Sequence, residues 1–253
     1  MNRVLTALIG VPVTVLLILF SPDVLLAVLV AAVSMLCLEE FLNLGKEALH
    51  TRPGPWVLVL GGVVTASFYG GPRLVVLALT FATLLSGVIS AFSIPLEKAF
   101  PKATLALMGF LYCGVLLGFL LWMSRELVLV MLGAIWIGDA AAYYGGRSLG
   151  RHPLAPRISP KKTVEGAFAG LLGSMVAGVV LGVLITDYSS GPLLTAAFFG
   201  ACSGQLGDLA ESAMKRSAGV KDSSSLLPGH GGMLDRVDSV LFAAPVYFWF
   251  FSS

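Results

Sequence analysis

Residues 164–186 read VEGAFAGLLGSMVAGVVLGVLIT, an apolar stretch in which Glu165 is the only charged residue. A helix of about 20 apolar residues is long enough to cross the hydrocarbon core of a bilayer. Backbone polar groups cannot stay unpaired in hydrocarbon, and the sequence lacks the alternating ten-residue pattern of a membrane β-barrel. The stretch therefore predicts a transmembrane α-helix.

The rest of the chain repeats this pattern between short turns rich in proline and glycine. Of its 253 residues, 57% are hydrophobic and 12% are charged, whereas soluble domains carry about 25% charged residues. We therefore expect an all-α, polytopic membrane protein that forms a single transmembrane domain, residues 1–253. About nine spans are predicted, near 4–20, 24–43, 56–71, 73–92, 103–122, 126–145, 164–186, 191–213 and 237–252.

Lysine and arginine are unevenly divided between the two sides that these spans define. Arg73 and Arg125 lie on one side, and the other fourteen of the 16 basic residues share the side of the N-terminus. The positive-inside rule then predicts a cytoplasmic N-terminus and, for an odd number of spans, a C-terminus outside. Both long polar loops, 146–163 and 214–236, would face the cytoplasm. The net charge of +2 is too small to indicate a nucleic-acid partner.

Asp139, Asp208 and Glu211 are three of the acidic residues that fall within the predicted spans. A carboxylate in a span costs at least about 2.5 kcal/mol, so each is a functional candidate. Along the predicted helix 191–213, Gly200, Gly204 and Asp208 recur every four residues. Close helix packing accounts for the two glycines taken alone, but a small-residue face ending in an acid favours contact with a metal or a substrate.

Acidic and basic residues alternate between the last two predicted spans. Carboxylates without cysteine suit a hard cation such as Mg²⁺, and basic side chains bind phosphate oxygens. Asp235 and Asp238 stand three residues apart, so in a helix both carboxylates face the same way. Capping of the helix N-terminus would account for one of them. The predicted metal ligands are Asp208, Asp235 and Asp238.

The run PGHGG at 228–232 combines one histidine with several glycines. Gly229, Gly231 and Gly232 allow positive φ angles and can present consecutive N–H groups to an anion, although a plain tight turn is the alternative interpretation. His230 would serve either as a proton acceptor or as a group that positions a phosphate, and the sequence alone does not choose.

The other polar loop contains RISPKKTVEG at 157–166. If Lys161 and Lys162 only anchored the protein to anionic lipid headgroups, no further polar residues would be needed beside them. Ser159 precedes them, and the stretch IGDAAAYYGGR places Asp139 on a helix that runs toward the same loop. We therefore expect this loop and Asp139 to contribute to the same site.

Two stretches carry a resemblance to a known family. Residues 212–238, SAMKRSAGVKDSSSLLPGHGGMLDRVD, resemble the signature of the phosphatidate cytidylyltransferases, also called CDP-diacylglycerol synthases. Residues 139–166 resemble a second region of these enzymes, except that Pro153 stands where relatives often have a basic residue. The similarity runs from about residue 135 to the C-terminus, and the first half matches only as generic spans.

The resemblance implies a reaction in which CTP and phosphatidic acid give CDP-diacylglycerol and pyrophosphate. It also implies a multi-pass protein of the cell membrane with its active site facing the cytoplasm, Mg²⁺ dependence and a homodimer, and it leaves open a second, monovalent cation such as K⁺. Residues 126–253 would form the catalytic half, and the helices in 1–125 receive no role. An ion-coupled transporter that uses Asp139, Asp208 and Glu211 is the alternative from another class.

The expected site combines this resemblance with the residue patterns above. Catalytic roles are expected for Asp208, Lys221, Asp222, His230, Asp235, Arg236 and Asp238. Substrate contacts are expected for Ser159, Lys161, Lys162, Ser212, Lys215, Arg216, Gly229, Gly231, Gly232, Asp139 and Glu211.

Overall fold

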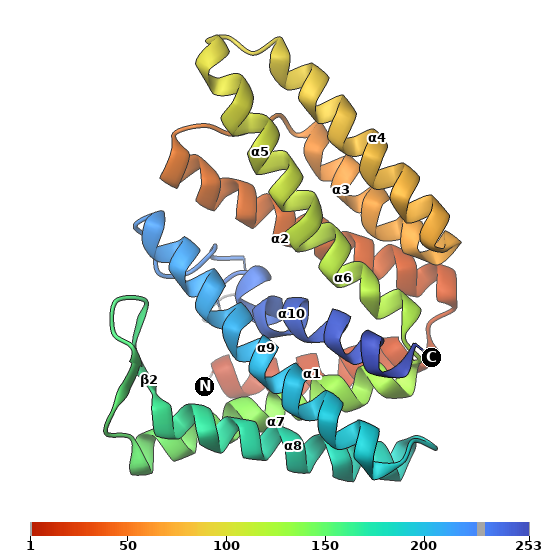
Figure 1. The fold of residues 1–253 in the computed structure, drawn as a ribbon, viewed down its shortest axis with the longest axis vertical. Helices are drawn as coiled ribbons and strands as arrows, with labels where there is room; N and C mark the ends of the chain where they lie inside the picture. The colour runs from red at the N-terminus through yellow and green to blue at the C-terminus, as the bar shows by residue number, and fades with distance from the viewer. Residues whose placement is uncertain (1, 227–230, 253) are drawn as a thin grey trace. The chain divides into compact units, whose positions relative to one another are not determined.

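The computed structural model describes residues 2–226 and 231–252, and helices make up most of them (Figure 1). The α-helices are α1 Asn2–Phe20, α2 Asp23–Leu49, α3 Trp56–Ala66, α4 Pro72–Ala91, α5 Ala99–Gly109, α6 Leu116–Gly118, α7 Arg125–Leu149, α8 Val164–Ile185, α9 Ser190–Ser217 and α10 Leu234–Phe251. Short 3₁₀ turns η1 Ser67–Gly70, η2 Leu96–Lys98 and η4 Phe119–Trp122, and the π-helical turn η3 Phe110–Val115, extend or join them.

Within residues 2–226 and 231–252, five helical segments are long and apolar enough to cross a membrane: Asp23–Leu49, Pro72–Ala91, Leu96–Trp122, Arg125–Leu149 and Val164–Ile185. Two shorter apolar helices, Gly10–Phe20 and Trp56–Gly70, accompany them. The expectation of a helical, multi-pass membrane protein is therefore confirmed. The count of nine spans and the orientation of the termini stay predictions.

The described chain divides into two compact units. The first unit comprises Met1–Trp122 and Met214–Arg236, and the second comprises Met123–Ala213 and Val237–Ser253. The expected catalytic half, residues 126–253, stays a prediction. The segment 214–236, however, groups with the first helices rather than with the rest of the expected catalytic half.

In the first unit, buried hydroxyl groups join α2 and α3 to the π-helical turn η3. Ser34 Oγ donates to the carbonyl of Cys113 at 3.0 Å and accepts from Thr65 Oγ1 at 2.7 Å. A π-helical turn interrupts the regular ladder of backbone hydrogen bonds, and side chains from neighbouring helices can satisfy its displaced carbonyls. These hydrogen bonds fix the middle of α2 against the segment Leu96–Trp122.

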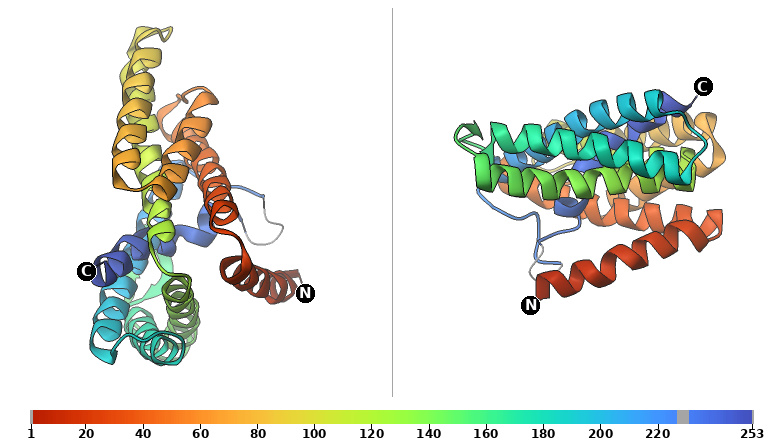
Figure 2. Two further views of the ribbon diagram at one scale, coloured as in Figure 1. Left: turned by 90° about the vertical axis from the view of Figure 1, so that its right-hand side faces the viewer. Right: turned by 90° about the horizontal axis from the view of Figure 1, so that it is seen from below.

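In the second unit, α7 and α8 run antiparallel and side by side (Figures 1 and 2). Small residues line the contact between them: a Cβ atom at Gly138 would lie 3.1 Å from the carbonyl oxygen of Gly170. Ser174 Oγ donates to the carbonyl of Ala134 at 2.9 Å. Close approach of backbones and interhelical hydrogen bonds are the usual means of helix association in membranes.

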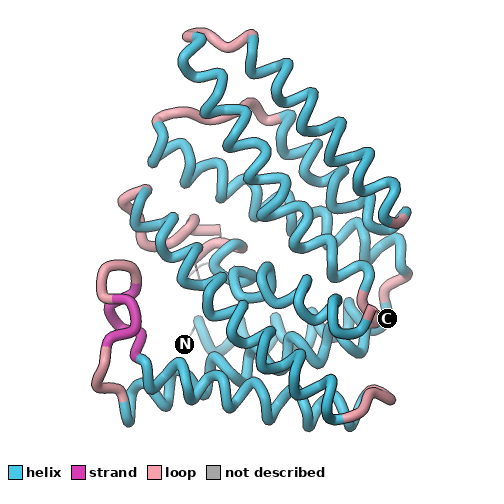
Figure 3. Tube along the Cα trace, viewed as in Figure 1, coloured by secondary structure: helices cyan, strands magenta, loops and turns pink. Residues whose placement is uncertain are grey.

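A two-stranded antiparallel hairpin connects these helices, and its strands are the magenta segments of Figure 3. It consists of β1 Pro153–Ala155 and β2 Ser159–Thr163, and the otherwise helical structure agrees with the expected all-α class. The Glu165 carboxylate on α8 accepts hydrogen bonds from the backbone N–H groups of Arg151 and His152. Thr163 caps α8 by accepting from the N–H of Gly166 at 3.1 Å.

Both polar loops are shorter than expected. Helix α7 continues to Leu149, so the first loop begins after that residue rather than at 146. Helix α9 continues to Ser217, which places Lys215 and Arg216 in its last turn rather than in a loop. Basic residues are favourable in the last turn of a helix because they interact with its negative end, which explains why the helix extends through them.

Candidate active site

Three carboxylates meet in the second unit. Asp208 and Glu211 of α9 and Asp238 of α10 each offer one oxygen, and these oxygens all lie within 4.8 Å of one another. Residues three apart on a helix face the same way, so α9 directs its two acids to one side. A Cβ atom at position 207 would lie 2.6 Å from the carbonyl oxygen of Asp238, so Gly207 is what lets the two backbones approach here.

This acidic cluster has the donor chemistry of a divalent cation site. Its oxygen ligands, without sulfur or imidazole among the three, suit a hard cation. Glu211 is fully buried, with 0% of its surface exposed. Carboxylates held this close repel one another in a poorly solvated place, and a bound cation would stabilise all three in the ionised form. The residues therefore fit a divalent metal.

Lys162 and Ser212 surround the Asp208 carboxylate within the same unit. The ammonium group of Lys162, on β2, forms an ion pair with Asp208 Oδ2. Ser212, one turn further along α9, donates its hydroxyl to Asp208 Oδ1 at 3.4 Å. The hairpin therefore supplies a positive charge at the edge of the acidic cluster.

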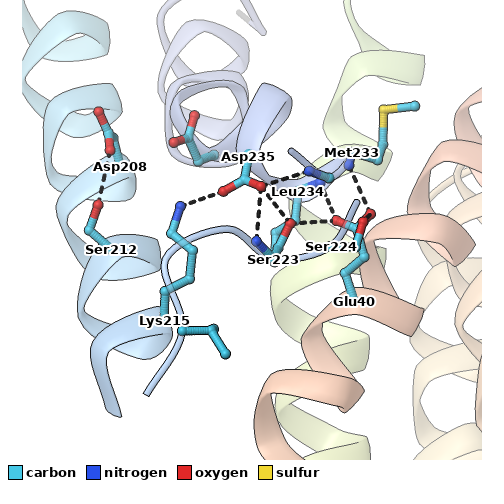
Figure 4. A network of polar contacts seen from close by, with 12 residues as sticks. Glu40, Asp208, Ser212, Lys215, Ser223, Ser224, Met233, Leu234 and Asp235 are labelled. Atoms are coloured by element: carbon cyan, nitrogen blue, oxygen red, sulfur yellow. Dashed lines mark hydrogen bonds and ion pairs between the residues drawn. The ribbon is translucent and has the colours of Figure 1, made fainter. Parts of the chain in front are cut away.

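Asp235 belongs to a different group of contacts, within the first unit (Figure 4). Its Oδ1 accepts a hydrogen bond from the ammonium group of Lys215 at 2.5 Å. The side chain of Asp235 is 8% exposed and that of Lys215 is 10% exposed. Its Oδ2 accepts from the N–H of Gly232 at 2.7 Å and from the N–H and hydroxyl of Ser223, each at 2.9 Å. Gly231 has a φ of 80°, a conformation that favours glycine.

These contacts set the charge state of Asp235. Burial by itself raises the pKa of the carboxyl group, but the hydrogen bonds from Lys215, Gly232 and Ser223 outweigh it and hold the pKa below its ordinary value. Asp235 is therefore ionised at neutral pH and held by several donors.

The predicted and observed acidic sets differ by one residue. We expected Asp208, Asp235 and Asp238 as metal ligands, whereas the cluster found among the described residues contains Glu211 in place of Asp235. The expected role of Glu211 is a substrate contact. Asp235 and Asp238 do lie on the first turns of α10, as expected, but they take part in different groups of contacts.

The remaining predicted residues are divided between the two units. Ser159 and Lys161 lie on β2 together with Lys162, and Asp139 lines a small cavity of the second unit with Gln205 and Ser239. Lys221, Asp222 and Arg236 are exposed, and Arg216 donates to the carbonyl of Val220 at 2.9 Å. Gly229 and His230 lie outside the described residues, so their expected roles stay predictions.

Glu40 is a buried acid that the sequence patterns above do not single out. This residue of α2 is 4% exposed. Its carboxylate accepts four hydrogen bonds, two from residues 223–224 and two from residues 233–234 at the start of α10 (Figure 4). A signal was present, because Glu40 falls inside the predicted span 24–43, where any carboxylate is costly.

The match to known proteins extends over the whole chain. The family model described as the cytidylyltransferase family matches residues 1–253. The chain belongs to the cytidylyltransferase family. The match thus includes the first half, which resembles the family only as generic spans.

Curated relatives of this cytidylyltransferase include enzymes of matching length. The phosphatidate cytidylyltransferase of Staphylococcus aureus (strain COL) is 32% identical over 253 residues, which cover 96% of each chain. That of Staphylococcus haemolyticus (strain JCSC1435) is 31% identical over 258 residues, again 96% of each. The uncharacterised protein YnbB of Escherichia coli (strain K12) is 46% identical over 124 residues, 49% of this chain and 42% of its own length.

Proposed function

We propose that this chain transfers the CMP moiety of CTP to phosphatidic acid and releases pyrophosphate. The alignment of the two staphylococcal phosphatidate cytidylyltransferases with 96% of the chain supports this activity. The structural observation that carries it is the acidic cluster of Asp208, Glu211 and Asp238 beside the Lys162 ammonium group. A reaction between two phosphate-bearing substrates requires such cationic and metal-binding groups.

The proposed chemistry is a displacement at phosphorus. A phosphate oxygen of phosphatidic acid attacks the α-phosphorus of CTP, and the bond between that phosphorus and the oxygen bridging to the β-phosphate breaks. Pyrophosphate leaves with the electrons of the broken bond, and CDP-diacylglycerol remains. The attacking monoester has a second pKa near 6 and is already largely ionised at neutral pH, so the protein needs no strong base. Binding and orientation of the substrates therefore supply most of the catalysis.

We propose Mg²⁺ as the cation of the acidic cluster, held by Asp208, Glu211 and Asp238. When bound, it would neutralise charge on the triphosphate and on the leaving pyrophosphate. This ligand set replaces the one expected from the sequence by exchanging Asp235 for Glu211. A second, monovalent cation and a homodimer stay predictions from the family resemblance.

Basic side chains would bind the substrate phosphates. Lys162 is the strongest candidate, because it already lies at the cluster, and Lys161 follows the same strand. The exposed Arg216, Lys221 and Arg236 are proposed to complete the phosphate contacts. Asp235 and Lys215 would instead hold the start of α10 in place through their ion pair.

The substrates differ in where they reside, and the site would have to serve both. CTP is water-soluble, while phosphatidic acid stays in the bilayer with its phosphate at the interface. We propose that the hairpin 153–163 and the segment 214–236 face the cytoplasm, as the distribution of basic residues predicts. The relatives give no support to the transporter alternative.

Transfer of label from nucleotide to lipid tests the proposal. Purified protein in detergent micelles is incubated with CTP labelled on cytosine, phosphatidic acid and Mg²⁺, and the lipid phase is extracted. We expect label in the lipid phase, and none when EDTA is present or when diacylglycerol replaces phosphatidic acid. Absence of lipid label from a well-folded preparation would contradict the proposed function.

A further inference from the structure

Glu40 connects a helix without an assigned role to the segment that carries several proposed site residues. Its carboxylate lies in the first unit, on α2, and both oxygens are used. Oε1 accepts from Ser224 Oγ at 2.7 Å and from the N–H of Met233 at 2.9 Å. Oε2 accepts from Ser223 Oγ and from the N–H of Leu234, both at 2.8 Å. One buried carboxylate thus holds two separate stretches of the chain.

The four donors explain why an acid occupies this position. Two are backbone N–H groups, which can only donate, and they lie at the start of α10, where N–H groups have no partner within the helix. A negative charge there also interacts favourably with the positive end of the helix. An ionised carboxylate offers acceptors on both oxygens, whereas the glutamine amide accepts only at its oxygen and its NH₂ group can only donate.

The contacts of Glu40 lead directly to those of Asp235. Ser223 Oγ lies 2.8 Å from the Glu40 carboxylate and 2.9 Å from that of Asp235, which in turn binds Lys215. The two carboxylates therefore share one hydroxyl group, as Figure 4 shows. Displacement of Ser223 and Leu234 would be passed on to Asp235 through these contacts.

We infer that Glu40 is a positioning residue for the proposed reaction. It fixes the start of α10 and the stretch 223–224, and so sets the placement of Asp235 and of Arg236, which follows it on α10. In this role Glu40 does not touch the reacting atoms. Only the expected effect on kcat rests on the proposed function. The structural part of the inference, that Glu40 holds the start of α10, stands independently of the substrate.

The test compares Glu40→Gln with Glu39→Gln. Glu39 is the preceding residue of the same helix, but it pairs with Arg52 and accepts from Asn43, so it is a matched control. Mispairing one or more of these hydrogen bonds to a charged group in Glu40→Gln should lower kcat roughly 10- to 100-fold. The KM for CTP should change less than kcat, and Glu39→Gln should stay within about twofold of the wild type.

Hydrogen exchange supplies a readout that does not depend on activity. In Glu40→Gln, backbone exchange should rise in peptides covering 231–236, while peptides from α7 and α8 keep their wild-type protection. A uniform rise throughout the protein would show a general loss of stability and would overturn the positioning role. Wild-type exchange together with wild-type kcat in Glu40→Gln would overturn it as well.

The outcomes separate this inference from the proposed function. If the wild type transfers no label from CTP, the proposed function fails, and the exchange experiment still decides whether Glu40 holds the start of α10. If Glu40→Gln does not elute as a folded species, Ser224→Ala removes one donor from the other side. That variant should lower kcat roughly three- to tenfold, since one hydrogen bond to a charged group is lost. Unchanged kcat and exchange in Ser224→Ala would then contradict the inference.

Discussion

Lys162 on β2 forms an ion pair with Asp208 on α9, which joins the hairpin of the second unit to the acidic cluster. The two side chains are 33% and 30% exposed, so water screens the pair. Ion pairs of this kind contribute about 0–1 kcal/mol to stability. The value of Lys162 therefore lies in the charge that it places beside the three carboxylates.

Replacement of Lys162 by glutamine should impair the reaction more than the fold. We expect kcat/KM for CTP to fall roughly 10- to 100-fold, because a charge-assisted contact to phosphate is lost. Thermal unfolding in detergent should stay close to that of the wild type. Arg157→Gln, in the exposed turn of the same hairpin, is the control and should keep nearly full activity. Equal activities of the two variants would argue against the role of Lys162.

The Lys215–Asp235 pair should behave in the opposite way, with a clear effect on stability. Both side chains are nearly buried, and removal of one partner from a buried pair typically costs about 3–5 kcal/mol. Asp235→Asn is therefore expected to lower the Tm by several degrees, as measured by thermal unfolding of the purified protein. Asp222→Asn changes an exposed acid nearby and should leave the Tm unchanged. The same Tm for both variants would be inconsistent with this account.

The lowered pKa of Asp235 predicts a dependence of stability on pH. Folding favours the ionised carboxylate, so this stabilisation is fully present above the ordinary carboxyl pKa of about 3.9 and is lost as the pH falls through the lowered value. The difference in stability between the wild type and Asp235→Asn should be constant from about pH 7 to 5 and should shrink below about pH 4. A difference that already disappears near pH 6 would contradict the lowered pKa.

Cysteine labelling tests the predicted orientation. Arg157→Cys places a thiol on the exposed hairpin turn, and Gly191→Cys places one at the start of α9, where a Cβ atom meets no neighbour within 4 Å. In intact cells, a membrane-impermeant maleimide should label position 191 and not position 157. Once the membranes are opened, both positions should be labelled. The reverse pattern would show that the hairpin faces outside. The native Cys37 and Cys113 are buried, and the half-buried Cys202 is replaced by alanine so that it contributes no label.

Hydropathy was sufficient to predict most of the helices, because length and apolar composition decide membrane insertion. It was less informative where polar residues extend a helix, as at Lys215 and Arg216, which belong to the last turn of α9. The hairpin was not foreseen, since residues 153–163 show no alternation of apolar and polar residues. Contacts of its ends with Glu165 are tertiary interactions, which a local pattern does not reveal.

The candidate site was predicted in part for similar reasons. The spacing of Asp208 and Glu211 on one helix indicated a shared face, but only the packing of α9 against Asp238 shows that Glu211 completes the cluster. Asp235 accepts hydrogen bonds from Ser223 and Gly232 and so belongs to a different group of contacts from Asp238. The spacing of the two acids in the sequence does not predict these contacts. Glu40 could have been found, because a carboxylate within an apolar span is costly wherever it occurs.

Direct measurement of Mg²⁺ binding tests the central claim, that Asp208, Glu211 and Asp238 together hold a divalent cation. Calorimetric titration of the purified protein with MgCl₂ is compared among Asp208→Asn, Glu211→Gln, Asp238→Asn and Asp235→Asn, at a temperature where all remain folded. We predict that each of the first three weakens binding at least about tenfold, as loss of a charged ligand should, and that Asp235→Asn binds within about threefold of the wild type. Loss of binding in Asp235→Asn with wild-type binding in Glu211→Gln would contradict the claim.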